Sequence, residues 1–68
     1  MACYIVNRNA QDNGQHEVHT ETCTTLPDLD NRIPLGSHTS CHGAVAKAKT
    51  IFPTADGCAN CCPDCNTG

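Results

Sequence analysis

Seven cysteines and four histidines are distributed over a chain of only 68 residues, and no other feature restricts its fold as strongly. Large apolar side chains are few, since the chain has one Phe, one Tyr, one Met and no Trp. A domain below about 70–80 residues rarely gains more than about 3–5 kcal/mol from its hydrophobic core. The sequence therefore predicts a single domain over residues 1–68 that depends on a bound metal or on disulfides.

The expected cellular compartment favours metal over disulfides. The chain opens Met-Ala-Cys-Tyr-Ile-Val, without the basic segment, apolar stretch or cleavage site of a signal peptide, so we expect a cytoplasmic protein. Thiols stay reduced in the cytoplasm, and seven is an odd number to pair. A disulfide scaffold is the alternative. No apolar run approaches the about 20 residues that a membrane-spanning helix needs.

The charge pattern offers little to a nucleic acid. The formal net charge is −3, and the four basic residues, Arg8, Arg32, Lys47 and Lys49, are scattered along the chain. Nucleic-acid binders usually concentrate basic residues on one surface, because neutralising phosphates supplies most of their non-specific affinity. We therefore expect a protein partner of unknown identity.

Three segments have the composition of strands. The first, Cys3 to Asn7, is rich in β-branched and aromatic residues, and the Asn13-Gly14 turn signal leads to a returning strand over residues 16–19. A third strand is predicted over Arg32 to Gly36, where Pro34 fits only an edge strand or a bulge.

A helix is predicted from Cys41 to Phe52. Ser40 is a suitable N-cap, and Pro53 stops the helix. Residues at helical spacing form one apolar stripe that we expect to pack on the sheet: Cys41, Val45, Ala48 and Phe52. Residues 54–57 are expected to turn the chain back. The predicted fold class is α+β, a small metal-stabilised domain with a two- to three-stranded antiparallel sheet and one helix.

Two short-spaced pairs of metal-binding residues stand on either side of the third strand and the helix. They are His19-x3-Cys23 and Cys58-x2-Cys61. Structural zinc prefers a closed tetrahedron of thiolate and imidazole ligands, which two such pairs form when the fold brings them together. Cys62-x2-Cys65 is a competing second pair, because a shift of four residues preserves the spacing.

The remaining cysteines and histidines have simpler interpretations. Cys41 lies on the apolar stripe and is expected to be a buried, free thiol, as is Cys3. Three histidines are expected to be solvated residues of loops or of the helix start: His16, His38 and His42.

The order of these features resembles the Ada-like metal-binding module, the small zinc domain of the Ada DNA-repair protein. The likeness covers about residues 19 to 61, from His19-x3-Cys23 through the Ser-capped helix to Gly57-Cys58-x2-Cys61. The chain is also similar to short Cys-rich bacterial proteins that begin with a Tyr-Ile-Val-Asn strand. The resemblance implies zinc ligation by four residues: His19, Cys23, Cys58 and Cys61.

Three catalytic interpretations are weaker than a structural one. Methyl transfer to a zinc-bound thiolate is what the resemblance implies most directly, but His19 stands where Ada has a cysteine, and a basic surface is lacking. Thiol-redox chemistry at Cys62-Pro-Asp-Cys65 needs a following helix to lower a thiol pKa. Hydrolysis needs an H-E-x-x-H spacing, which residues 16–19 do not have. We therefore predict a non-enzymatic zinc-binding structural or interaction module, with methyl acceptor or thiol-redox protein as the alternative.

Overall fold

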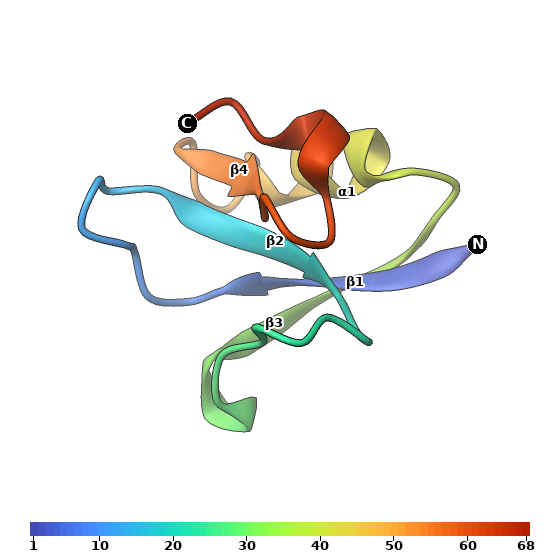
Figure 1. Cartoon of the computed structure of the whole chain (residues 1–68), viewed down its shortest axis with the longest axis horizontal. Coiled ribbons are helices and arrows are strands. Elements are labelled where there is room, and N and C mark those ends of the chain that lie inside the picture. The colour runs from blue at the N-terminus through green and yellow to red at the C-terminus, as the bar shows by residue number, and fades with distance from the viewer.

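Four strands in the spatial order β3-β1-β2-β4 form one sheet, and a single α-helix covers one of its faces (Figure 1). The computed structural model describes all residues from 1 to 68. Its elements are β1 (Ala2–Asn7), β2 (His16–Thr20), β3 (Arg32–His38), α1 (Cys41–Ala48) and β4 (Ala55–Gly57), with short 3-10 helices at Leu29–Asn31 and Pro63–Cys65. The fold class is α+β with one α-helix, as predicted.

The sheet has one strand more than predicted, and it is mixed. β4 pairs in parallel with β2, placing His16 opposite Ala55 and Val18 opposite Gly57, whereas the other two pairings are antiparallel. The prediction of two to three antiparallel strands was therefore wrong in this detail. The β4 segment, Ala55–Gly57, is too short and too poor in β-branched residues to signal a strand in the sequence. It forms a strand because the edge of β2 is open for pairing.

The β1–β2 hairpin forms where the sequence predicts it. Gly14 adopts φ +85°, which a residue without a Cβ reaches at little cost. The register places Val6 opposite Val18, and Ile5 opposite His19. Because side chains alternate between the faces of a strand, Val6 and Val18 point toward α1, and Ile5 and His19 lie on the other face.

β3 is an edge strand with a bulge, as Pro34 required. Pro34 pairs with Ile5, and Gly36 pairs with Tyr4. Leu35, which lies between them, has no partner on β1 and is the extra residue of the bulge. Gly36 has φ +82°, a conformation that favours glycine. The bulge directs Leu35 into the core, where its side chain is fully buried.

The helix begins at Cys41, after Ser40, but ends at Ala48 and not at Phe52. Beyond Ala48 the chain continues as a turn in which the Ile51 and Phe52 amides both donate to the Ala48 carbonyl. This turn leaves Ile51 exposed and lays the Phe52 ring flat on His16, with ring centroids 3.7 Å apart. No helix of the chain has the length and apolar character needed to cross a bilayer.

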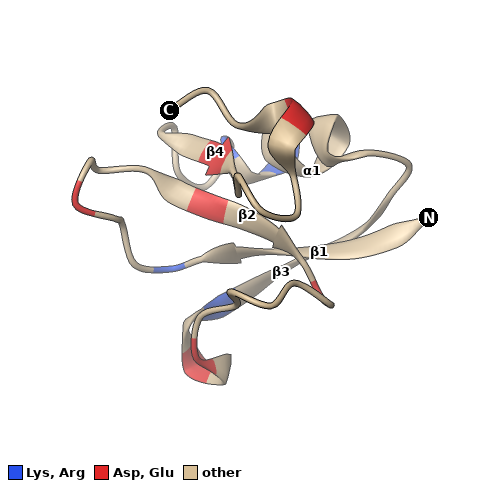
Figure 2. Cartoon of the chain, in the orientation of Figure 1, with Lys and Arg blue, Asp and Glu red and all other residues tan.

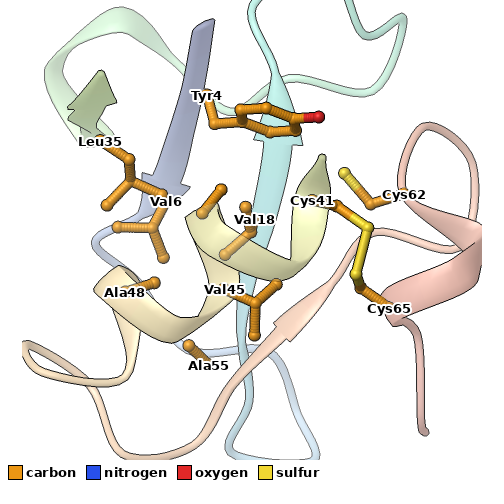
Figure 3. Close-up of a cluster of buried hydrophobic side chains, with 11 residues drawn as sticks. Tyr4, Val6, Val18, Leu35, Cys41, Val45, Ala48, Ala55, Cys62 and Cys65 are labelled. Carbon is orange, nitrogen blue, oxygen red and sulfur yellow. A yellow bond between two sulfur atoms is a disulfide. The ribbon is translucent and has the colours of Figure 1, made fainter. Parts of the chain in front are cut away.

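The core lies between α1 and the sheet, and a disulfide closes one end of it (Figure 3). The bond joins Cys41, at the start of α1, to Cys65. The prediction of a free thiol at Cys41 was therefore wrong, although the residue is buried on the apolar stripe as expected. Cys3 is free as predicted, but it is exposed and not buried. Stripe periodicity indicates which residues are buried, but it carries no information about which thiol lies opposite.

The C-terminal residues pack tightly on β4. A Cβ built on Gly57 would lie 2.7 Å from Cys65 Cβ and 2.8 Å from the Cys62 carbonyl oxygen, so only glycine fits there. The buried Asp56 carboxylate accepts hydrogen bonds from the Thr67 amide, at 3.0 Å, and from the Thr67 hydroxyl, at 2.9 Å. Together these contacts hold the end of the chain against the sheet.

Candidate metal centre

The four residues that the spacing singled out come together in the structure. Sγ of Cys23, Cys58 and Cys61 and a ring nitrogen of His19 all lie within 4.8 Å of one another. Three of the residues are buried and Cys61 is partly buried. They form a Cys/His cluster that is positioned to bind a metal ion.

Each half of the cluster is fixed by backbone hydrogen bonds to β2 or its end. His19 belongs to β2 itself, and the Cys23 amide closes a turn by donating to the Thr20 carbonyl at 3.1 Å. From the other half, the Cys58 amide donates to the Val18 carbonyl at 2.9 Å, directly after β4. The parallel β2–β4 pairing, absent from the sequence prediction, is therefore what brings the two pairs together.

The donor set fits a tetrahedral ion. Zinc–sulfur bonds of about 2.3 Å and zinc–nitrogen bonds of about 2.0–2.1 Å imply ligand–ligand edges of about 3.6–3.8 Å. The distance from Cys61 Sγ to His19 Nδ1 is 3.9 Å, close to that edge. Three thiols and one imidazole form the donor combination of closed structural zinc sites, in which the protein fills all four positions.

Backbone and hydroxyl donors already point at the sulfur atoms. The Thr20 amide donates to Cys61 Sγ and the Asn60 amide to Cys58 Sγ, each at 3.4 Å. The Thr25 hydroxyl lies 3.2 Å from Cys23 Sγ and 3.6 Å from Cys58 Sγ. Such donors stabilise negative charge on sulfur, and thiolate is the form of cysteine that binds metal.

Two thiols of the cluster, those of Cys23 and Cys61, have opposite pKa shifts. Burial acts to raise the pKa of Cys23, but hydrogen bonds from Thr25, Cys61 and His19 outweigh it and lower the pKa to about 6. Burial raises the pKa of Cys61, and its hydrogen bond to Cys23 raises it further. Of these two thiols, Cys23 is therefore the one whose surroundings favour the thiolate form.

Glu17 supplies an outer contact that the sequence did not reveal. Its Oε1 lies 3.7 Å from Nε2 of His19, the ring nitrogen opposite the one that approaches Cys61. A carboxylate on the far side of a ligating imidazole fixes the ring orientation and its tautomer. The sequence could have indicated this contact, because Glu17 and His19 are two apart on β2, and such residues lie on the same face of a strand.

The competing pair, Cys62 and Cys65, lies elsewhere. Cys65 is bonded to Cys41, and the buried Cys62 packs in the core cluster (Figure 3). Of the other histidines, His16 contacts the Asn7 carbonyl, His38 contacts the Leu35 carbonyl, and His42 is exposed beside the disulfide. The prediction that all three are solvated holds for His42 alone, since His16 and His38 are part-buried.

Comparisons of the chain with protein-family models, with curated proteins and with solved structures find no match.

Proposed function

We propose that the protein is a non-enzymatic zinc-binding module in which His19, Cys23, Cys58 and Cys61 hold one structural zinc ion. The observation that carries the proposal is the convergence of four soft donors, from two distant segments, on one largely buried point. Thiolate and imidazole ligands suit zinc, whereas calcium and magnesium require oxygen ligands.

A structural role is favoured over catalysis by the closed donor set. A catalytic zinc site keeps one position open to water, whereas four protein donors complete the tetrahedron here. The Cys62-Pro-Asp-Cys65 motif does not form a disulfide of its own, because Cys65 pairs with Cys41. Burial also raises the pKa of Cys62, which opposes a role as a reactive thiolate.

We propose a protein partner for this module. The basic side chains are dispersed, as Figure 2 shows, with Arg8 after β1, Arg32 at the start of β3 and two lysines at the end of α1. Such a surface can neutralise few phosphates, and the net charge of −3 repels a polyanion. This distribution also disfavours the approach to DNA that Ada-like methyl acceptance would need.

The deciding experiment measures metal content and free thiols together. Purified protein should contain one zinc per chain by elemental analysis. After chelation and denaturation it should show five free thiols, because seven cysteines less the Cys41–Cys65 pair leave five. Protein without metal and with three disulfides would overturn the proposal.

A further inference from the structure

A second group of potential ligands surrounds the Cys41–Cys65 disulfide. Sγ of Cys41, Sγ of Cys65 and a ring nitrogen of His42 all lie within 4.8 Å of one another. Two of these sulfur atoms are joined in the disulfide, and in that form they have no thiolate to offer. The two cysteines are therefore a covalent bridge in one redox state and, with His42, a group of donors in the other.

Cys62 is the nearest candidate for a fourth donor, although its Sγ lies outside the group of three and 3.9 Å from Cys61 Sγ. Its free side chain is buried in the core cluster with Cys41 and Cys65 (Figure 3). A pocket of about 250 Å³ opens beside the disulfide, and Cys41, His42 and Cys62 all contribute to its wall, as does Cys61 of the first cluster. The His42 side chain is exposed at the start of α1, and its Nδ1 lies 3.5 Å from Ser40 Oγ.

We propose that reduction of the Cys41–Cys65 disulfide creates a second metal site, in which Cys41, Cys62, Cys65 and His42 bind a thiophilic divalent cation such as zinc. The reductant is a dithiol, which passes two electrons and two protons to the bridge and becomes a disulfide itself. The S–S bond breaks, and the two sulfur atoms separate toward the about 3.8 Å edge of a zinc tetrahedron. Metal binding then displaces the three thiol protons into solvent.

The sequence shows why the two sites do not compete for the same residues. Cys58-x2-Cys61 and Cys62-x2-Cys65 follow each other directly, and each pair has one partner segment of its own. The first pair meets His19 and Cys23, and the second meets Cys41 and His42. Six of the seven cysteines and two histidines are thus divided between two sets of three thiols and one imidazole.

The test is a count of zinc per chain in both redox states. The full chain is oxidised, or reduced with dithiothreitol under anaerobic conditions, then desalted, saturated with zinc and desalted again. We expect one zinc per oxidised chain and two per reduced chain. If the reduced wild type holds only one zinc, and the reduced His42→Ala variant also holds one, the second site is overturned. The proposed function would then remain intact.

The His42→Ala variant separates this inference from a general effect on folding, because His42 is exposed. Its oxidised form should keep one zinc, and its reduced form should lose the second. Cys3→Ser is the matched control, since Cys3 is a free and exposed thiol outside both groups. It should leave the reduced count at two, and a drop to one in this control would contradict the assignment.

Cobalt gives a readout of the ligands themselves. The second cobalt equivalent taken up by the reduced chain should add thiolate-to-cobalt charge transfer and the visible bands of tetrahedral cobalt. Both should be lost in His42→Ala and in Cys62→Ser. An oxidised chain without any metal would contradict the proposed function. In that case, loss of zinc from the reduced His42→Ala variant would support the second site, and retention of zinc would contradict it.

Discussion

The Sγ atoms of Cys61 and Cys62 lie 3.9 Å apart, yet only Cys61 belongs to the group formed with His19, Cys23 and Cys58. Cys61 faces His19 and Cys23, and Cys62 packs with the Cys41–Cys65 disulfide. The Cys62 amide closes a turn over residues 58–62 by donating to the Cys58 carbonyl at 2.8 Å. One short turn therefore carries both a residue of the Cys/His cluster and a residue that packs with the disulfide.

Removal of one cluster ligand should abolish zinc binding and unfold the chain. Structural zinc contributes on the order of 10–16 kcal/mol in small domains, far more than this core can supply. We expect collapsed amide NMR spectra for His19→Ala and Cys58→Ser with stoichiometric zinc, and dispersed spectra for Cys3→Ser. A dispersed, zinc-loaded Cys58→Ser protein would show that the first cluster is not the metal site.

Loss of the disulfide should weaken the fold without abolishing it. The bridge closes a separation of 24 residues, for which chain entropy predicts about 3 kcal/mol of stabilisation. Cys65→Ser should lower the free energy of unfolding by that amount in oxidised protein with one zinc. Its stability should not respond to reductant, whereas the stability of the wild type should fall. Urea titration measures both, and a Cys65→Ser protein as stable as the oxidised wild type would refute the bridge.

Gly57→Ala should destabilise the domain by about 1–3 kcal/mol, a typical cost of overpacking. The added methyl group would meet the Cys62 carbonyl and the Cys65 backbone below 3.0 Å, and backbone cannot rotate away. Gly43→Ala is the control, because its Cβ would approach only the His38 side chain, at 3.1 Å. Thermal unfolding of both variants tests the contact, and equal stabilities would contradict it.

Asp56→Ala should release the C-terminal residues from the sheet. The carboxylate holds the Thr67 amide and hydroxyl, and Asn66 Nδ2 donates to the Gly57 carbonyl beside it at 2.9 Å. Loss of the two bonds from Thr67 to the Asp56 carboxylate should cost about 1–3 kcal/mol. Hydrogen exchange at the Thr67 amide should accelerate, with exposed Asp12→Ala as the control. Unchanged protection in Asp56→Ala would show that the tail is held by other contacts.

Duplex DNA should not bind measurably at physiological salt. Four dispersed cations give little counterion release, and the chain carries net negative charge. Fluorescence titration with a labelled duplex tests this expectation. A micromolar complex that weakens with salt would revive the Ada-like methyl acceptor as the leading function.

The elements that could be predicted from the sequence are those with local signals. β-branched and aromatic residues mark β1, alternating residues mark β2, Asn13-Gly14 marks their turn, and Ser40 marks the start of α1. The ligand spacing also selected the four residues that converge. β4 lacked any such signal, since three small or polar residues form a strand only when β2 is already present. The Cys41–Cys65 pair was equally hidden, because pairing depends on which side chains meet in the fold.

The late position of β4 has a consequence for synthesis of the chain. Half of the first ligand cluster and the strand that aligns it both lie after residue 54, whereas β2 ends at Thr20. A nascent chain that has emerged only as far as α1 therefore has His19 and Cys23 without their partners. We expect such a chain to remain unfolded on the ribosome, with its thiols exposed to metal ions and oxidants. Folding and metal capture should then coincide, once Cys65 has left the exit tunnel.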